Sequence, residues 1–282
     1  MRKILFLLFA IHLYGVETEV VHSSVVGYFE SKTYKNSKQK EAGKVYGIGG
    51  DIHYFANEFR FVYENGAATT KKPPLDKDLK NEKIFFRYRY TKDRLSFYGN
   101  YLRVLHDNIA ITSGGDGYGI GVGYKIDDIA LNFTQYMVMY NDFKTYQSDI
   151  KLEYKTNFDA FKVKFTLLDK YISLDDKQAN IFTKNAKKSY NTFGIKLHTH
   201  YKSYHLGGGA FFGKRVFAIM NDGFKLQHHA MEFSKTYAIG IGKTLKPFIA
   251  RVQYIYQKAK ELPIQNDGVV IKNMRFIFNY KF

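Results

Sequence analysis

The sequence contains no cysteine and no tryptophan, and only four of its 282 residues are proline. Without cysteine the chain can form no disulfide bond, thiolate nucleophile, cysteine-based zinc site or lipid-attached N-terminal cysteine. No stretch of about 18 apolar residues follows the N-terminal region, so the sequence predicts no transmembrane helix there. Thiol chemistry and a helical membrane domain are therefore not expected.

Aromatic side chains and positive charge are abundant. Tyrosine and phenylalanine number 24 and 25, and both favour β-strands, while tyrosine also suits a membrane–water boundary. The mean hydropathy of −0.35 is too polar for a bundle of membrane helices, but a β-barrel conceals its apolar surface in alternation. The formal charge of +17 is typical of proteins that bind nucleic acid, bind anionic lipid or provide a pathway for anions.

The N-terminus predicts export. The basic pair Arg2 and Lys3 precedes an apolar run over residues 4–14, and Gly15 offers a small residue for cleavage. We therefore predict a signal peptide over residues 1–15. An N-terminal membrane anchor is the alternative, but the run is shorter than the roughly 20 residues that a spanning helix needs. Because an exported wall protein rarely meets nucleic acid, we expect no nucleic-acid partner.

After the signal peptide, apolar and polar positions alternate in segments of about ten residues, which is typical of strands with one oily and one wet face. The last segment is the clearest, with Met274, Phe276 and Phe278 on one face and Arg275 and Asn279 on the other. We count about fourteen such segments, within a range of roughly 12 to 16. They begin near Val20, Lys44, Glu58, Glu82, Arg94, Asp116, Asp128, Gln147, Ala160, Ser189, Lys202, Ala230, Pro247 and Val270. The predicted fold is all-β, a closed antiparallel up-and-down transmembrane β-barrel that forms one domain over residues 16–282.

The connections alternate between tight turns and longer loops. Tight turns are predicted at residues 56–57, 92–93, 127–128, 157–159, near 201 and at 244–246. Longer loops are predicted at residues 31–43, 65–81, 106–115, 141–146, 170–188, 214–229 and 258–268. Outer-membrane barrels have short periplasmic turns and longer extracellular loops. With fourteen strands, both termini are then expected on the periplasmic side.

The chain ends in alternating aromatics, Phe276, Phe278, Tyr280 and the final Phe282. In this feature it resembles the outer-membrane β-barrel proteins of Gram-negative bacteria, whose last strand is read by the barrel-assembly machinery. The resemblance implies an assembly signal at Phe278, Tyr280 and Phe282, and contacts with outer-membrane lipid and lipopolysaccharide. Size and strand count also resemble the small monomeric fourteen-stranded porins. The missing tryptophan is a departure, so tyrosine and phenylalanine must build the interfacial girdles.

If the apolar face points to lipid, the other face lines the lumen. This assignment predicts a basic pore lining, made of Arg60, Arg87, Arg89, Lys125, Lys151, Lys155, Lys162, Lys164, Lys196, Arg251 and Arg275. Inward acids are fewer, namely Glu64, Asp149, Glu153 and Glu232. Unpaired cations are costly in a dry core but tolerable in a water-filled channel, where Arg and Lys favour anions. We predict a porin-like channel for passive diffusion of ions and small polar solutes that favours anions.

Four features of the predicted barrel allow more than one interpretation. The loops over residues 65–81 and 170–188 are the longest and are candidates to fold inward. Glycine at every second position of residues 117–123 indicates a smooth, open stretch of wall or room for an inserted loop, because no helix follows to support nucleotide binding. Lys235 falls on the outward face of its strand, so either a bulge turns it inward or the strand sits lower in the membrane. The side of Arg103 is left unassigned.

Histidine offers the only candidate metal ligands. His198, His200 and His205 face inward near one turn, but no nearby carboxylate supports them as a zinc site, so pore lining is the expected role. We predict no metal, no cofactor and no catalytic residues. The alternatives are an outer-membrane enzyme of the lipase or protease class, a transporter with an N-terminal hatch, and a plugged structural or adhesin barrel.

Overall fold

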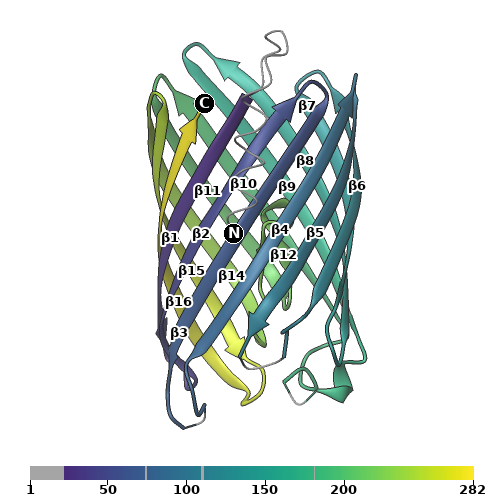
Figure 1. Cartoon of the computed structure of the whole chain (residues 1–282), viewed down its shortest axis with the longest axis vertical. Coiled ribbons are helices and arrows are strands. Elements are labelled where there is room, and N and C mark those ends of the chain that lie inside the picture. Colours follow the sequence, from purple (N-terminus) through teal and green to yellow (C-terminus); the bar gives the residue numbers. More distant parts are fainter. Residues whose placement is uncertain (1–21, 74, 109–110, 181) are drawn as a thin grey trace, which may run out of the picture.

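The computed structural model describes residues 22–73, 75–108, 111–180 and 182–282. The predicted signal peptide lies outside the described residues. Fourteen antiparallel strands form a closed barrel in which each strand pairs with its chain neighbours and β1 closes the ring against β16 (Figure 1). The barrel strands are β1 (His22–Lys35), β2 (Lys40–Tyr54), β3 (Asn57–Thr70), β4 (Leu79–Lys92), β5 (Leu95–Asp107), β6 (Asp116–Ile126), β7 (Ile129–Met139), β8 (Lys144–Phe158), β9 (Phe161–Asp175), β10 (Ser189–Tyr201), β11 (Tyr204–Arg215), β14 (Met231–Leu245), β15 (Phe248–Glu261) and β16 (Asn266–Lys281).

The remaining elements are short. They are β12 (Ile219–Met220), β13 (Lys225–Leu226) and the 3-10 turns η1 (Lys177–Ala179) and η2 (Asn221–Gly223). In the described part of the chain, no helix has the length and apolar character needed to cross a membrane. The predicted fold class is confirmed, and each of the fourteen predicted segments begins within four residues of a barrel strand.

The two ends of the barrel differ as the alternating connections predict. Six connections of two residues each, such as 93–94 and 127–128, lie at one end, which we name the turn end. Asp93, Asp127 and Asp159 take positive φ there, a conformation that aspartate tolerates in tight turns. The last strand also finishes at the turn end, where Lys281 pairs with Ser24. The seven longer connections lie at the opposite end, the loop end.

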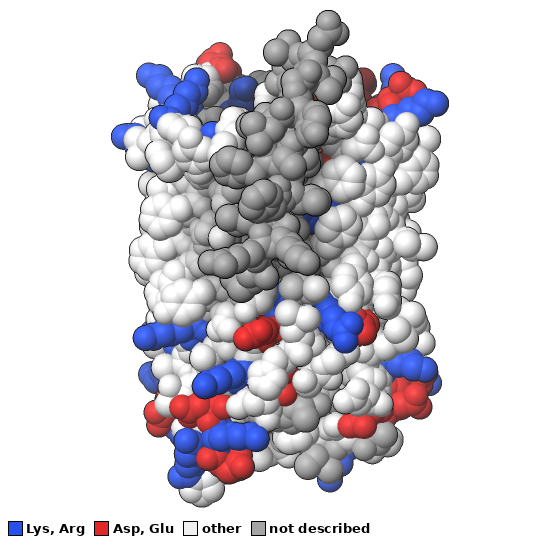
Figure 2. Space-filling model, viewed as in Figure 1, with Lys and Arg blue, Asp and Glu red and all other residues white. Residues whose placement is uncertain are grey.

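Period-two alternation sorts the side chains between two faces. Large apolar residues point outward and are exposed, for example Ile120 (72%), Phe278 (60%) and Phe133 (45%). Figure 2 shows the result as a broad uncharged band, with lysine, arginine and acidic residues gathered above and below it. A continuous apolar belt of this size on a closed barrel is stable against lipid and costly in water.

One strand contains an irregularity near its loop end. The pairing of β14 with β15 shifts between Phe233 and Lys235, which forms a β-bulge. The bulge turns Phe233 inward, where it is buried, and leaves Lys235 exposed on the outer face. The first alternative, a bulge that turns Lys235 inward, is therefore wrong, because the bulge redirects Phe233 instead. The second alternative, a strand that sits lower in the membrane, remains a prediction. Arg103 is also outward, with its guanidinium 3.8 Å from the Asp116 carboxylate.

One long connection enters the barrel. Residues 216–230, which carry β12, η2 and β13, fold back into the lumen as a hairpin that Figure 1 shows inside the wall. We name this segment the inturned hairpin. Strands β3, β4 and β9 extend into the two loops expected to fold inward and leave residues 71–78 and 176–188 outside the strands. The second of these loops does pack inward at the loop end, because Ala186 belongs to the buried cluster of the hairpin and Asn185 Nδ2 donates to the Leu262 carbonyl at 3.1 Å. The inturned hairpin is also the segment with apolar side chains to bury, from Val216 to Met220.

A candidate solute pathway in the lumen

Apolar packing fixes the inturned hairpin in the loop-end half of the lumen. Val216, Phe217 and Ile219 are each at most 1% exposed, and they belong to one buried cluster that also contains residues from β3 to β11. The Phe217 ring lies 4.8 Å from that of Phe143 and 5.8 Å from that of Tyr140, between ring centroids. The hairpin therefore joins opposite walls through a dry core, as a folded domain does, and narrows the lumen at this level.

Two wall residues bind the hairpin backbone. The Gln147 side chain on β8 donates to the Ile219 carbonyl and accepts from the Ile219 N–H, both at 2.8 Å. Lys170 on β9 donates to the same carbonyl at 3.2 Å and forms a buried ion pair with Asp149. These bonds satisfy polar groups that would be expensive to bury alone.

The tip of the hairpin carries an acid that meets cations of the wall. Asp222 lies 3.0 Å from the Lys151 ammonium on β8 and 3.9 Å from the Arg87 guanidinium on β4. Burial alone would raise the pKa of Asp222, but Lys151 and Arg87 lower it below its usual range. The acid therefore stays ionised and bound to the wall across the neutral pH range.

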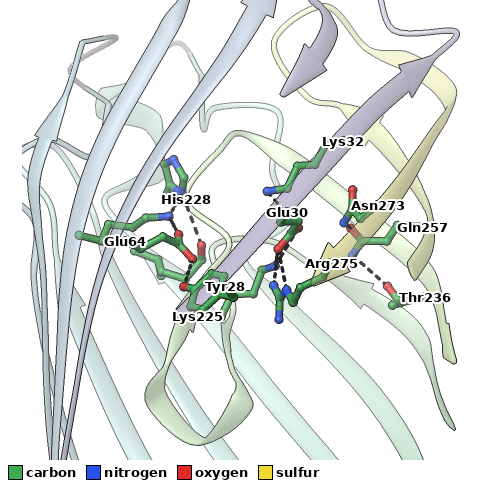
Figure 3. Close-up of polar contacts among 12 residues, drawn as sticks. Tyr28, Glu30, Lys32, Glu64, Lys225, His228, Thr236, Gln257, Asn273 and Arg275 are labelled. Atoms are coloured by element: carbon green, nitrogen blue, oxygen red, sulfur yellow. Dashed lines mark hydrogen bonds and ion pairs between the residues drawn. The ribbon is translucent and has the colours of Figure 1, made fainter. Parts of the chain in front are cut away.

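The other side of the tip has the opposite polarity. Lys225 reaches the fully buried Glu30 of β1, with its ammonium 3.3 Å from the carboxylate (Figure 3). Glu30 also accepts from Arg275 Nε at 2.9 Å and lies 3.3 Å from Lys32. Three cations thus surround one carboxylate, so this cluster keeps an excess of positive charge.

A cavity of about 460 Å³ lies between the inturned hairpin and the wall of β8–β11 and β14–β16. We name it the cationic cavity. Seven basic and two acidic side chains line it: Lys151, Lys164, Lys196, Arg215, Lys225, Arg251 and Arg275, with Glu153 and Asp222. A confined space with this charge balance concentrates anions.

The predicted pore-lining residues divide into three groups. Lys151, Lys164, Lys196, Arg251 and Arg275 line the cationic cavity. Arg60, Arg87 and Arg89 face the lumen on β3 and β4, where Arg60 and Arg89 pair with Glu58. Lys125, Lys155 and Lys162 are exposed near the turns and are not among the cavity-lining residues.

Several important residues were not predicted. Lys83 has the same strand parity as Arg87 and forms a buried ion pair with Glu64 at 2.5 Å, so alternation alone was sufficient to find it. Arg215 and Lys225 fell within a predicted loop and carried no periodic signal. Glu30, which pairs with Lys225, lies on the same inward face of β1 as Tyr28, but no inward residues were predicted for this strand.

The histidine cluster lies at the turn end. The His200 and His205 rings stack with centroids 4.3 Å apart, and those of His198 and His205 are 5.8 Å apart. His205 Nε2 forms a 2.7 Å hydrogen bond with the Thr244 hydroxyl. Over the residues that the structure describes, no group of three or more His, Asp or Glu side chains is placed to hold a metal ion.

The alternate glycines of β6 face inward but do not leave an open wall. A Cβ at Gly119 would come within 2.4 Å of the Tyr136 ring, and one at Gly117 within 2.6 Å of Leu102. These glycines therefore make room for bulky neighbours. Gly207 on β11 differs, because an added Cβ would meet nothing closer than 3.6 Å, and this glycine lines the cationic cavity.

Comparisons with known proteins show what class this fold belongs to. No family model matches the sequence, and no curated protein matches it. A bacterial polysaccharide outer-membrane secretin is similar over 93% of this chain and 98% of its own, with a TM-score of 0.56 and 8% identity. The toluene transporter TbuX of Ralstonia pickettii is similar over 94% of this chain and 89% of its own, with a TM-score of 0.54 and 11% identity.

Identities this low establish the fold alone, which is that of outer-membrane β-barrels. The closed ring of strands and the exposed apolar belt require the same surroundings. The chain therefore has the fold of an outer-membrane β-barrel, and its apolar belt fits a lipid membrane.

Proposed function

We propose that this protein is an outer-membrane channel for passive diffusion of small polar solutes, with a preference for anions. The observation that carries the proposal is the cationic cavity, with seven basic and two acidic side chains in one space inside the barrel. Basic residues in a confined lumen select by sign and raise the local concentration of anions. The turn end would face the periplasm and the loop end the outside, as in other outer-membrane barrels.

The inturned hairpin would act as the gate of this channel. Its apolar side chains pack against the wall on the loop-end side of the cavity, so passage requires this segment to move. The ion pairs of Asp222 and Lys225 hold its tip, and both are polar contacts that water or a passing solute can replace. A two-state hairpin of this kind is a recognised device for gating.

We also propose contacts of the outer surface with the assembly machinery and with lipopolysaccharide. Phe278, Tyr280 and Phe282 all point outward on or beside β16 and are exposed, which leaves them accessible to the barrel-assembly machinery. Exposed lysines at the loop end, such as Lys77 and Lys80, would contact lipopolysaccharide phosphates. The absence of enzymatic activity remains a prediction.

The test is solute flux through liposomes that contain the refolded protein. We expect an anionic solute, such as gluconate, to cross faster than a cation of similar size. Equal rates would remove the anion preference but keep the channel. No flux for any solute, from the parent protein or from a variant with residues 219–226 replaced by a Gly-Ser linker, would contradict the channel. That outcome would favour a plugged structural barrel, which the packing of the hairpin also fits.

A further inference from the structure

One cation of the cationic cavity is buried without an acid. Arg215 is 0% exposed, and its guanidinium carbon lies 5.5 Å from the ring centroids of both Phe211 and Phe233. Its Nε donates to Gln227 at 3.1 Å, and one terminal nitrogen donates to Thr236. The other terminal nitrogen is buried and has no hydrogen-bond partner. A buried charge that is only partly satisfied is expensive, so the site favours an anion that completes it.

Two further cations of the same cavity are not in direct contact with an acid, although Asp222 attracts Lys196 at longer range. Lys196 on β10 lies 5.6 Å from the centroid of the Phe211 ring, the ring that Arg215 also faces. Arg251 on β15 has a buried Nε with no partner. Among the described residues, neither forms an ion pair, whereas the other four cations of the cavity each contact a carboxylate: Lys151, Lys164, Lys225 and Arg275. Positive charge without an ion-pair partner therefore lies beside Phe211, at Arg215 and Lys196, and further toward the turn end, at Arg251.

Neutral polar groups continue the wall beside these cations. Gln257 Nε2 donates to the Thr236 hydroxyl at 3.2 Å, and Asn273 Nδ2 donates to Gln257 Oε1 at 3.5 Å (Figure 3). The Asn273 carbonyl oxygen is buried and lacks a partner. Amides and hydroxyls recognise hydroxyl groups well, because they can both donate and accept. Gly207 lines the same cavity nearer the turn end, where an added Cβ would meet only His198 and the backbone.

We propose that the cationic cavity is a binding site for one small organic acid that carries several hydroxyl groups, such as a sugar acid. Its carboxylate lies near Arg215 and Lys196, and its hydroxyls contact Thr236, Gln257 and Asn273. Arg251 adds positive charge on the turn-end side of the same cavity. The volume of about 460 Å³ falls in the usual range of small-molecule sites. This inference deepens the proposed channel function, because it names the solute class that the channel holds on its way through.

The test is calorimetric titration of the refolded protein, in a zwitterionic detergent, with three matched solutes. Gluconate carries both carboxylate and hydroxyls, sorbitol lacks the carboxylate, and acetate lacks the hydroxyls. We expect saturable one-to-one binding of gluconate, at least tenfold weaker binding of acetate, and none of sorbitol. Acetate binding as tight as gluconate would overturn the hydroxyl part of the proposal, and no gluconate binding would overturn all of it.

Variants locate the site. Lys196→Met should weaken gluconate binding by roughly 10- to 100-fold, the usual effect of losing a hydrogen bond to a charged group. Arg251→Gln should weaken it less, because Arg251 lies further toward the turn end. Gly207→Val should weaken it similarly by filling the cavity while removing no charge. Lys155→Met, which removes an exposed lysine outside the cavity, is the control and should change affinity less than about twofold. Equal affinity in Lys196→Met, Gly207→Val and the parent protein would refute the site.

The outcomes of the two proposals are separable. Anion-selective flux without gluconate binding would leave the channel intact and remove the binding site. Gluconate binding that depends on Lys196, in a protein that conducts nothing, would keep the site and contradict the channel.

Discussion

Truncating Phe217 should release the inturned hairpin without disturbing the barrel. The Phe217 side chain is 1% exposed, and it packs against Tyr140 and Phe143. Phe217→Ala removes this packing and leaves a cavity, which costs about 3–5 kcal/mol for a buried phenylalanine. The backbone hydrogen bonds of the barrel do not involve this side chain, so the substitution should destabilise the docked hairpin and not the barrel. Because about 1.4 kcal/mol corresponds to a factor of ten, the ratio of docked to released protein should fall by roughly 10²- to 10⁴-fold.

Single-channel recording in a planar bilayer measures this shift. The parent protein should spend most of its time at low conductance, and Phe217→Ala should show frequent or sustained openings. Phe133→Ala is the matched control, because it makes the same truncation on the lipid-facing surface, where Phe133 is 45% exposed. Limited trypsin digestion gives a second readout, since cleavage after Lys225 requires a released hairpin. A folded Phe217→Ala protein with parental conductance and parental resistance to trypsin would refute the gate.

Three further predictions concern charge, pH and assembly. Asp222→Asn should lengthen channel openings by several-fold, because a partly exposed ion pair contributes only about 1 kcal/mol, and unchanged open times would show that the tip is held by apolar packing alone. Burial and Lys83 lower the pKa of His228 well below its ordinary value, and burial and Lys40 do the same for His229, while Glu64 opposes the shift at His228. The docked hairpin then binds fewer protons than the released one, so the docked state keeps its full stability above about pH 6.5 and loses stability as the pH falls below that value. The open probability of the channel should therefore rise from pH 7 to pH 5. This rise should be absent in the double variant His228→Asn/His229→Asn. Phe282→Ala should slow assembly of the barrel in an outer-membrane insertion assay and Lys281→Ala should not, with equal rates arguing against an assembly signal in the last aromatic residue.

The strands and their faces could be predicted because alternation encodes them directly. Once Met274, Phe276 and Phe278 are assigned outward, the orientation of every other side chain of β16 is determined. The pairing of neighbouring strands then determines which residues of those strands face outward. The loop lengths then separated the two ends of the barrel, which the structure confirms.

Height along the barrel axis is not encoded in alternation. Lys155 and Lys151 have the same parity on β8, yet Lys151 meets Asp222 in the lumen and Lys155 is exposed near the turn. Alternation therefore predicts which cations face inward but not which of them lie together.

The inturned hairpin escaped prediction because its signal is not periodic. The apolar run from Val216 to Met220 is short and lies between two strands, as an ordinary loop does. Only the tertiary structure shows that this run completes a core with Val104, Val138 and Ile172 from distant strands. The same contacts brought Arg215 and Lys225 into the cationic cavity, where strand parity could not place them.

The reversal potential of single channels under a potassium chloride gradient tests the central claim most directly. A channel whose cationic cavity has seven basic and two acidic side chains should pass chloride faster than potassium, and the preference should weaken in Lys196→Met/Arg251→Gln. A reversal potential of the opposite sign, or one that these substitutions leave unchanged, would contradict the account.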